Sequence, residues 1–365
     1  MSANDDLATL VMSVGPTASV YLDTTSATTD PRGQIDLRWK NARRHLEDAG
    51  ADAATLDAME ATVAEGHGGG DALAMFATGG SVLHHSRWPD APIEDLARWA
   101  PLASVGPIIA WRQSMAPHLV VQVDRVGADM VVFRSGEPEV EAEVSGDDLH
   151  VQRSAPGGWS QRRFQQRAEN QWESNAGEVA DHLVELFDMA SARLVVVSGD
   201  VRARQFLKES LPARVLDVLE EVDGGREEEA NERIAEETGR LLATVVASDT
   251  VALLAKFREE RGQDDRATDG VPATVEALQR AQVETLLVRD DPADDRSLWF
   301  GPDGVHLAMD PGTLAELGVT SPQEGRLPDV LIRAALASGG DVRIVPMTAE
   351  NGPTDEVGAI LRWAA

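Results

Sequence analysis

Residues 149–167 read LHVQRSAPGGWSQRRFQQR and separate a group of predicted short strands from a predicted long helix. This stretch contains four arginines and no carboxylate. The whole chain has 33 Lys and Arg against 62 Asp and Glu, a formal net charge of −29 at pH 7. Binding to phosphates needs concentrated positive charge. Any contact with nucleic acid is therefore expected at this stretch and not over the acidic surface as a whole.

The tip of the stretch, residues 156–160, combines conformational freedom with an aromatic ring and a small polar group. Glycines let a backbone approach a nucleic-acid surface closely, an indole can stack on a base, and guanidinium groups can bind phosphates. The alternative is an ordinary surface loop whose arginines pair with neighbouring acids. The candidate RNA-binding residues are Arg153, Gly157, Gly158, Trp159, Ser160, Gln161, Arg162, Arg163 and Arg167.

Length and composition bound the class of protein. A chain of 365 residues with 42% hydrophobic residues suggests two or three folded domains. The absence of cysteine removes disulfides, thiolate metal sites and cysteine nucleophiles. The eight histidines show no metal-binding spacing and no P-loop is present, so neither a metal nor a cofactor is expected. No signal peptide pattern and no apolar run of membrane-spanning length occurs, which predicts a cytoplasmic protein without a membrane partner.

Alternating strand and helix patterns predict an α/β (α+β) chain of three domains, with boundaries at 1–112, 113–265 and 266–365. The first is a small α/β domain. The middle domain opens with a meander of three strands, and the third alternates strands with helices. The strands expected most strongly lie at 18–22, 72–77, 118–124, 128–133, 139–144, 194–197, 284–288 and 341–345, with a further strand around 215–218, and the clearest helices lie at 34–48, 169–190, 201–210 and 328–337.

The stretch 156–164 resembles the Gly-Gly-Gln loop of archaeo-eukaryotic class-I peptide release factors, in which the motif is followed by polar residues and an Arg-Phe pair. Residues 270–288 look like the start of that family's third domain, and residues 355–363 are similar to its closing strand. The three anchors occur in the family's order across residues 117–365. The chain resembles most the bacterial and archaeal branch of this Pelota-like superfamily, family 2, including the actinobacterial Balon-related ribosome hibernation factors.

The resemblance implies a ribonuclease-H-like middle domain that reaches the peptidyl-transferase centre of the ribosome. It implies a carboxyl-terminal α/β domain, similar to kink-turn-binding ribosomal proteins, that docks a translational GTPase. The expected function is that of a ribosome-binding factor, in hibernation or at stalled ribosomes, which occupies the A site and contacts ribosomal RNA but not DNA. The first domain resembles its release-factor counterpart in layout and contains no Asn-Ile-Lys-Ser motif, so stop-codon reading is not expected.

The loop departs from the family at the residue on which release chemistry depends. Trp159 stands where the family has glutamine, and Gln161 lies two residues further on. A displacement of about 1 Å can reduce a positioned reaction by two orders of magnitude, so we expect no catalytic residue. The alternative is a release or rescue factor that hydrolyses peptidyl-tRNA with Gln161 in the place of the missing glutamine. A third hypothesis is an acidic oligomerising protein with no RNA partner.

Overall fold

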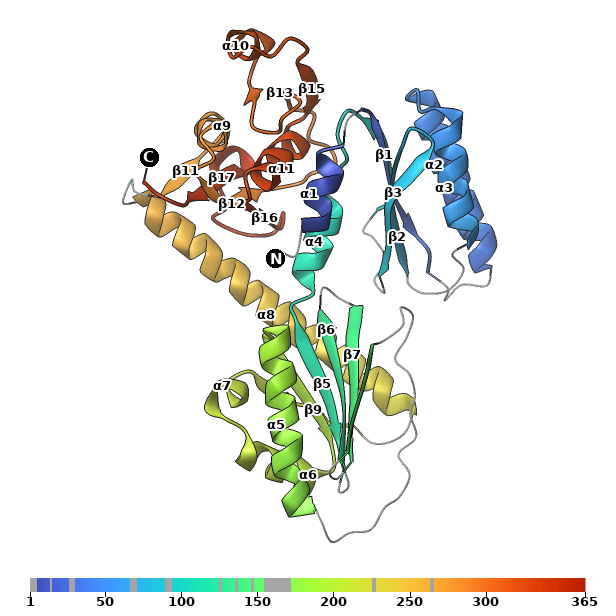
Figure 1. Cartoon of the computed structure of the whole chain (residues 1–365), viewed down its shortest axis with the longest axis vertical. Coiled ribbons are helices and arrows are strands. Elements are labelled where there is room, and N and C mark those ends of the chain that lie inside the picture. The colour runs from blue at the N-terminus through green and yellow to red at the C-terminus, as the bar shows by residue number, and fades with distance from the viewer. Residues whose placement is uncertain are drawn as a thin grey trace. The chain divides into compact units, whose positions relative to one another are not determined.

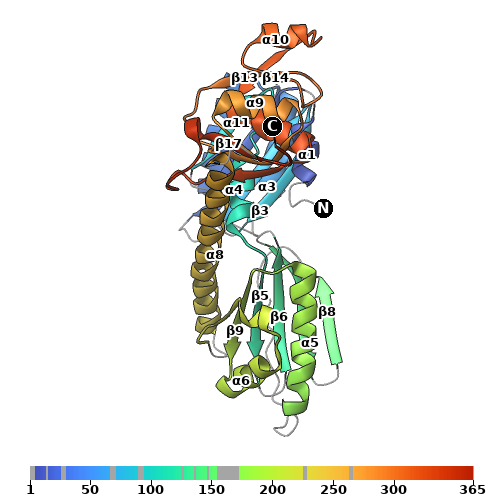
Figure 2. The same ribbon diagram turned by 90° about the vertical axis from the view of Figure 1, so that its left-hand side faces the viewer.

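The computed structural model contains two compact units, one made of Met1–Trp111 together with Thr250–Ala365 and the other of Arg112–Asp249. We call them the discontinuous unit and the middle unit. Both contain helices and strands (Figures 1 and 2), which confirms the predicted mixed α/β class. The structure describes residues 5–13, 15–25, 30–65, 71–88, 94–124, 127–134, 137–145, 148–153, 172–224, 228–262 and 266–364.

The middle unit is built on one six-stranded sheet with the strand order β10-β9-β5-β6-β7-β8. Strands β5 to β8 form an antiparallel meander, whereas β9 and β10 extend the sheet in parallel from β5. The predicted meander and the predicted strand at 194–197 are thereby confirmed. The strands are β5 (His118–Val123), β6 (Gly127–Arg134), β7 (Glu137–Ser145), β8 (Asp148–Arg153), β9 (Leu194–Gly199) and β10 (Leu219–Glu221).

Helices cover both faces of this sheet, which explains why β5 and β9 read as continuous apolar runs. Leu119 and Val121 pack with helices α5 and α6 on one face. Val120 and Val196 point the opposite way and pack with Ile234 of α8. The helices are α5 (Trp172–Ala190), α6 (Val201–Ser210), α7 (Ala213–Leu216) and α8 (Glu228–Gly262).

The strand expected around 215–218 is wrong, because a short helix, α7, occupies this position. Pro212 precedes it with φ −70°, and its carbonyl accepts the backbone N–H groups of Val215 and Leu216. Proline is well suited to the start of a helix because a backbone N–H there has no acceptor within the helix, so proline loses no hydrogen bond by lacking it. Burial of Val215 against the core of the unit then outweighs its intrinsic preference for strands. The strand begins afterwards, at Leu219.

The amino-terminal part of the discontinuous unit contains an antiparallel sheet with the order β3-β2-β1-β4. Val20 and Leu73 face helices α2 and α3, where they pack with Trp39. Tyr21 and Phe76 face the opposite side and make an edge-to-face contact. The elements are β1 (Thr17–Asp23), α2 (Pro31–Asp48), α3 (Ala53–Glu65), β2 (Ala72–Thr78), β3 (Ser81–Trp88) and β4 (Leu96–Ala100).

The carboxyl-terminal part contains two further sheets, with the orders β11-β17-β12-β16 and β14-β13-β15. Strand β12 is parallel to β16 and antiparallel to β17. The elements are β11 (Ala267–Asp269), α9 (Val271–Gln279), β12 (Val283–Val288), β13 (Ser297–Phe300), β14 (Leu307–Ala308), α10 (Pro311–Glu316), β15 (Gln323–Arg326), α11 (Leu327–Ala337), β16 (Asp341–Ile344), η1 (Thr354–Glu356) and β17 (Val357–Leu361).

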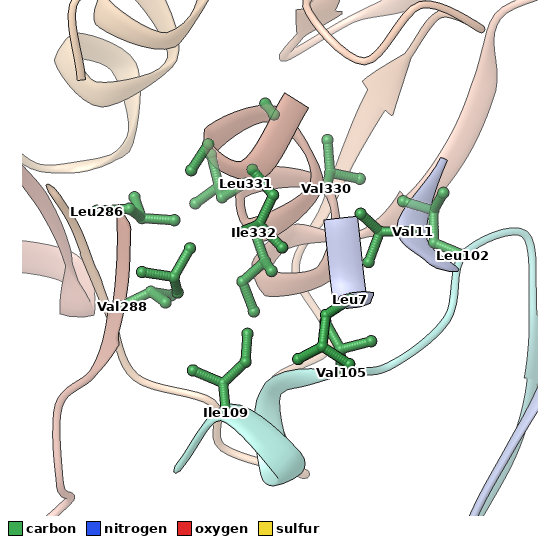
Figure 3. Close-up of a cluster of buried hydrophobic side chains, with 14 of the residues drawn as sticks. Leu7, Val11, Leu102, Val105, Ile109, Leu286, Val288, Val330, Leu331 and Ile332 are labelled. Carbon is green, nitrogen blue, oxygen red and sulfur yellow. The ribbon is translucent and has the colours of Figure 1, made fainter. Parts of the chain in front are cut away.

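One hydrophobic core joins these two parts of the discontinuous unit (Figure 3). Leu7 of α1 (Asp5–Val11) and Ile109 of α4 (Gly106–Ser114) lie in the same cluster as Leu286 of β12 and Leu331 of α11. Segments almost the whole chain length apart therefore fold as one body. The predicted domain boundaries at 112 and 265 stay a prediction, since one core can cover two domains.

Helix α8 belongs to both units, because the division falls at Asp249 and Thr250. Among the described residues, its segment Asn231–Gly262 is long and apolar enough to span a membrane by length and composition. The core helices of other folds pass the same test. Here Ile234 and Leu242 are buried in the core of the middle unit, and Phe257 is buried in that of the discontinuous unit. This packing accounts for only part of the apolar character of the helix, because 17% of its apolar window is buried.

Candidate nucleic-acid interface

The predicted RNA-binding stretch begins at the edge of the sheet of the middle unit. Its first candidate residue, Arg153, is the last residue of β8 and is in register with Val140 of β7. Strand β8 is the outermost strand on that side. The other candidates, which include the tip residues and Gln161, lie outside the described residues. They are Gly157, Gly158, Trp159, Ser160, Gln161, Arg162, Arg163 and Arg167.

The two elements on either side of residues 154–171, β8 and α5, are both held by the sheet of the middle unit. On its amino-terminal side, β8 pairs with β7, and Ala142 of β7 is buried in the core. On its carboxyl-terminal side, α5 buries Val179 and Leu183 against the same sheet. Residues 154–171, which lie outside the described residues, thus connect two elements that the core of the middle unit holds in place.

Several cationic side chains in the described part of the middle unit are paired with carboxylates. Exposed pairs of this kind contribute only about 0–1 kcal/mol to stability, but they cancel the local positive field. Arg204 differs from the other paired residues because its side chain is buried, so a large ligand cannot reach it. The pairs are Arg193 with Asp249, Arg204 with Glu221 and Asp223, Lys208 with Glu221, Arg214 with Asp188, and Arg240 with Glu236 and Glu237.

His118 adds no positive charge to the middle unit at neutral pH. Its ring stacks on Phe133 with centroids 4.6 Å apart, and the side chain is buried. Burial lowers the pKa of the His118 imidazole to about 4, against the smaller opposing effect of a hydrogen bond to the carbonyl of Ala116. His118 therefore does not offset the contrast in charge between the arginines of 149–167 and the rest of this unit.

Two aspartates lie just beyond the carboxyl ends of the parallel strands β5 and β9, where α/β sheets commonly bind ligands. Asp124 accepts the N–H of Gly127 at 3.0 Å. Asp200 caps α6 by accepting the N–H groups of Arg202 and Ala203 at 3.0 and 3.1 Å. Both carboxylates thus have structural roles. For Asp200 alone a sequence signal exists, because an aspartate directly between an apolar run and a helix indicates an N-cap.

A metal site does not emerge from the part of the chain that the structure describes, where no three His, Asp or Glu side chains are grouped to hold an ion. At the sheet edge that carries Asp124 and Asp200, the two carboxylates are bound to backbone N–H groups instead. The candidate site stays the arginine-containing stretch 149–167, which begins within β8.

The middle of the chain is similar to a known family of proteins. Residues 117–263 match the model of Bacterial archaeo-eukaryotic release factor family 2. This match covers nearly all of the middle unit and continues along α8. The chain is also 29% identical, over 367 aligned positions, to each of two Mycobacterium tuberculosis proteins, Rv2629 of strain H37Rv and MT2704 of strain CDC 1551. Each alignment covers 98% of this chain and 96% of the relative.

Solved structures to which this chain is similar include Pelota proteins of archaea and a yeast protein. Archaeoglobus fulgidus Pelota is 16% identical with a TM-score of 0.36, and covers 98% of this chain and 91% of its own. An archaeal Pelota from a ribosome-bound complex is 14% identical with a TM-score of 0.42, over 100% and 95%. Saccharomyces cerevisiae Dom34 is 11% identical with a TM-score of 0.38, over 80% and 81%.

Proposed function

We propose that this chain, whose residues 117–263 match the model of Bacterial archaeo-eukaryotic release factor family 2, is a ribosome-associated translation factor of that family. In this proposal it occupies the A site, in hibernation or at stalled ribosomes, and performs no chemistry of its own. The observation that carries the proposal is the stretch 149–167, which has four arginines and no carboxylate in a chain of net charge −29. Ribosomal RNA is the partner whose phosphates such a stretch fits.

The charge pairing in the middle unit supports the choice of this stretch as the RNA contact. Arginines of the described surface, such as Arg193 and Arg214, already have carboxylate partners at 2.6 and 2.9 Å. A phosphate at those positions would have to displace an acid. The arginines Arg162, Arg163 and Arg167 have no acid in their own stretch of sequence. Contact with RNA is therefore most favourable there, and the acidic remainder limits indiscriminate binding.

The tip sequence supports occupancy over hydrolysis. In the resembled release factors a glutamine follows Gly-Gly directly, whereas this chain has Trp159 there and Gln161 two positions later. An indole at the tip suits stacking on a base and has no group that could orient a water molecule as an amide does. The carboxyl-terminal segment 266–365 is the part that, by the same resemblance, would contact a translational GTPase.

Ribosome co-sedimentation from stationary-phase cells tests the assigned role of the stretch. The double variant Arg162→Ala/Arg163→Ala should bind ribosomes at least about 10-fold more weakly. The negative slope of log affinity against log salt concentration should become shallower by about two, because two phosphates are no longer neutralised. Arg202→Ala/Arg240→Ala removes the same charge from exposed positions of the middle unit and serves as the control. If both double variants sediment like the unsubstituted protein, the stretch does not carry the binding.

Occupancy of the A site and peptide release are separable on stalled ribosomes that carry a labelled peptidyl-tRNA. The protein should compete with tRNA for the empty A site and leave the labelled peptide attached. Release of the label by the unsubstituted protein, abolished in Gln161→Ala, would instead establish the hydrolytic alternative. Release that persists at full rate in Gln161→Ala would exclude Gln161 as the responsible residue.

A further inference from the structure

Ser104 lies between β4 and α4, and each of its polar groups is engaged. Its N–H donates to Oγ of Ser19 at 3.0 Å, and its carbonyl accepts the hydroxyl of Tyr21 at 2.8 Å. Both partners belong to β1, so Ser104 is fixed to the amino-terminal sheet. Its own hydroxyl donates to Oδ2 of Asp329 at 3.0 Å, in the first turn of α11. A single serine thus connects segment 1–111 to segment 250–365.

The carboxyl of Asp329 is buried without a close cationic partner. Only 2% of the residue is exposed, and its Oδ1 atom accepts no hydrogen bond within the described part of the chain. The guanidinium of Arg326 is 3.7 Å from Oδ1, and that of Arg98 is 3.9 Å from Oδ2. These distances are longer than the donor–acceptor distance of a hydrogen bond. Arg326 therefore acts on Asp329 through its charge, whereas Arg98 acts through its charge and also donates to the Ser104 hydroxyl at 3.3 Å.

A second carboxylate competes with Asp329 for the nearer arginine. Asp290, which follows β12, forms an ion pair with Nη1 of Arg326. The Nη2 group of the same arginine donates to the carbonyl of Asp291. Asp290 also lies against the first residue of α4, because a Cβ atom on Gly106 would fall 1.9 Å from its Oδ2 atom. The cluster thus contains two carboxylates and two guanidinium groups at the junction of the two segments.

These surroundings decide which protonation state of Asp329 the folded protein prefers. Burial raises the pKa of Asp329 most and the charge of Asp290 raises it further, to about 7, whereas Arg326, Arg98 and the Ser104 hydroxyl lower it. The ordinary value is 3.8. A carboxyl with a raised pKa binds its proton more tightly in the folded than in the unfolded state. Its contribution to stability therefore falls as the pH rises from about 4 through 7.

We propose that Asp329, together with Ser104, Arg98, Asp290 and Arg326, forms a proton-sensitive clasp that holds segment 1–111 to segment 250–365 more tightly as the solution becomes mildly acidic. Protonation removes the repulsion between Asp329 and Asp290 and leaves Asp290 paired with Arg326. Ionisation places a second buried carboxylate in the junction with no hydrogen-bonded cation of its own. The clasp is a property of the discontinuous unit and does not depend on ribosome binding.

Hydrogen exchange of the full chain between pH 5 and pH 8 tests the clasp, with rates corrected for the intrinsic pH dependence of exchange. The opening equilibrium reported by amides in 98–109 and 327–333 should rise with pH by about 10-fold to 100-fold, the range that follows from the raised pKa. Asp329→Asn stays neutral and should abolish this rise. Glu316→Gln removes an exposed carboxylate of the same unit and should leave the rise unchanged.

Carbon-detected titration of the aspartate carboxyl groups provides a measurement that needs no folded Asp329→Asn variant. One carboxyl signal of the unsubstituted protein should titrate near pH 7. In Ser104→Ala the midpoint should move to higher pH, because the carboxylate no longer accepts a hydrogen bond from the serine hydroxyl. The clasp is overturned if every aspartate signal titrates below pH 5. It is equally overturned if Asp329→Asn folds and keeps the pH dependence of exchange.

Discussion

Gly199→Ala should destabilise the middle unit by roughly 2–5 kcal/mol, from the strain of a disfavoured backbone conformation and from overpacking. Gly199 ends β9 with φ +109°, a region that residues with a side chain rarely adopt. A Cβ atom there would fall 1.9 Å from the carbonyl oxygen of Val123, its register partner in β5. The obstacle is the backbone of a buried strand, so no side chain can turn away to make room.

Urea unfolding of Gly199→Ala beside Gly177→Ala gives a matched comparison within one unit. Gly177 lies in α5, is exposed, and a Cβ atom on it would meet nothing within 4 Å. Alanine there should leave stability unchanged or raise it by up to about 1 kcal/mol, because alanine favours a helix more than glycine does. Equal losses of stability in the two variants would show that the close approach between the ends of β5 and β9 does not limit stability.

Arg333→Ala should cost the discontinuous unit roughly 3–5 kcal/mol, since it leaves buried acceptors without donors and opens a cavity. The Arg333 side chain is buried in α11 and donates to three carbonyls: Val11 at 3.1 Å, Gly301 at 2.8 Å and Pro302 at 2.7 Å. Its guanidinium also lies over the ring of Phe300, 5.1 Å from the centroid. One side chain thereby satisfies the end of α1 and the turn after β13.

Arg333→Lys and Arg343→Ala separate the geometry of this interaction from its charge. Lysine keeps the charge but has no planar fork that can reach three separate carbonyls, so it should recover only part of the stability. Arg343 is exposed on β16, where it pairs with Asp341 at 3.5 Å, and its removal should cost less than about 1 kcal/mol. Thermal unfolding that ranks Arg343→Ala as the more damaging change would contradict the assigned role of Arg333.

Local patterns were sufficient to predict most elements of the middle unit, because β5 and β9 are buried along most of their length and the turns of the meander contain glycine. The expected helix at 201–210 coincides with α6, and the strand at 194–197 lies within β9. The wrong strand at 215–218 shows the limit of such patterns. Valine preference is local, whereas the burial of Val215 depends on distant parts of the chain.

The shared core and the clasp could not be predicted in the same way. Nothing in the residues around Ser104 indicates that its hydroxyl meets Asp329, which is 225 positions further along the chain. The core likewise brings Leu7 together with Leu331. For the candidate interface, sequence and structure are complementary: the sequence identifies the arginines, and the structure describes the strand and helix between which they lie.

The discontinuous unit has a consequence for how the chain is made. Its core needs Ile109 and also β17, which ends at Leu361, so about 250 residues must be synthesised between them. At roughly 5–20 residues per second, that interval lasts about 12–50 seconds. The sheet of β1 to β4 can pack against α2 and α3 early. The opposite face of the sheet, which contains Tyr21, can be buried only after the carboxyl-terminal part of the unit has been made. During that wait an apolar surface is open on the nascent chain, which makes this stage of synthesis the one most exposed to misassembly and to chaperones.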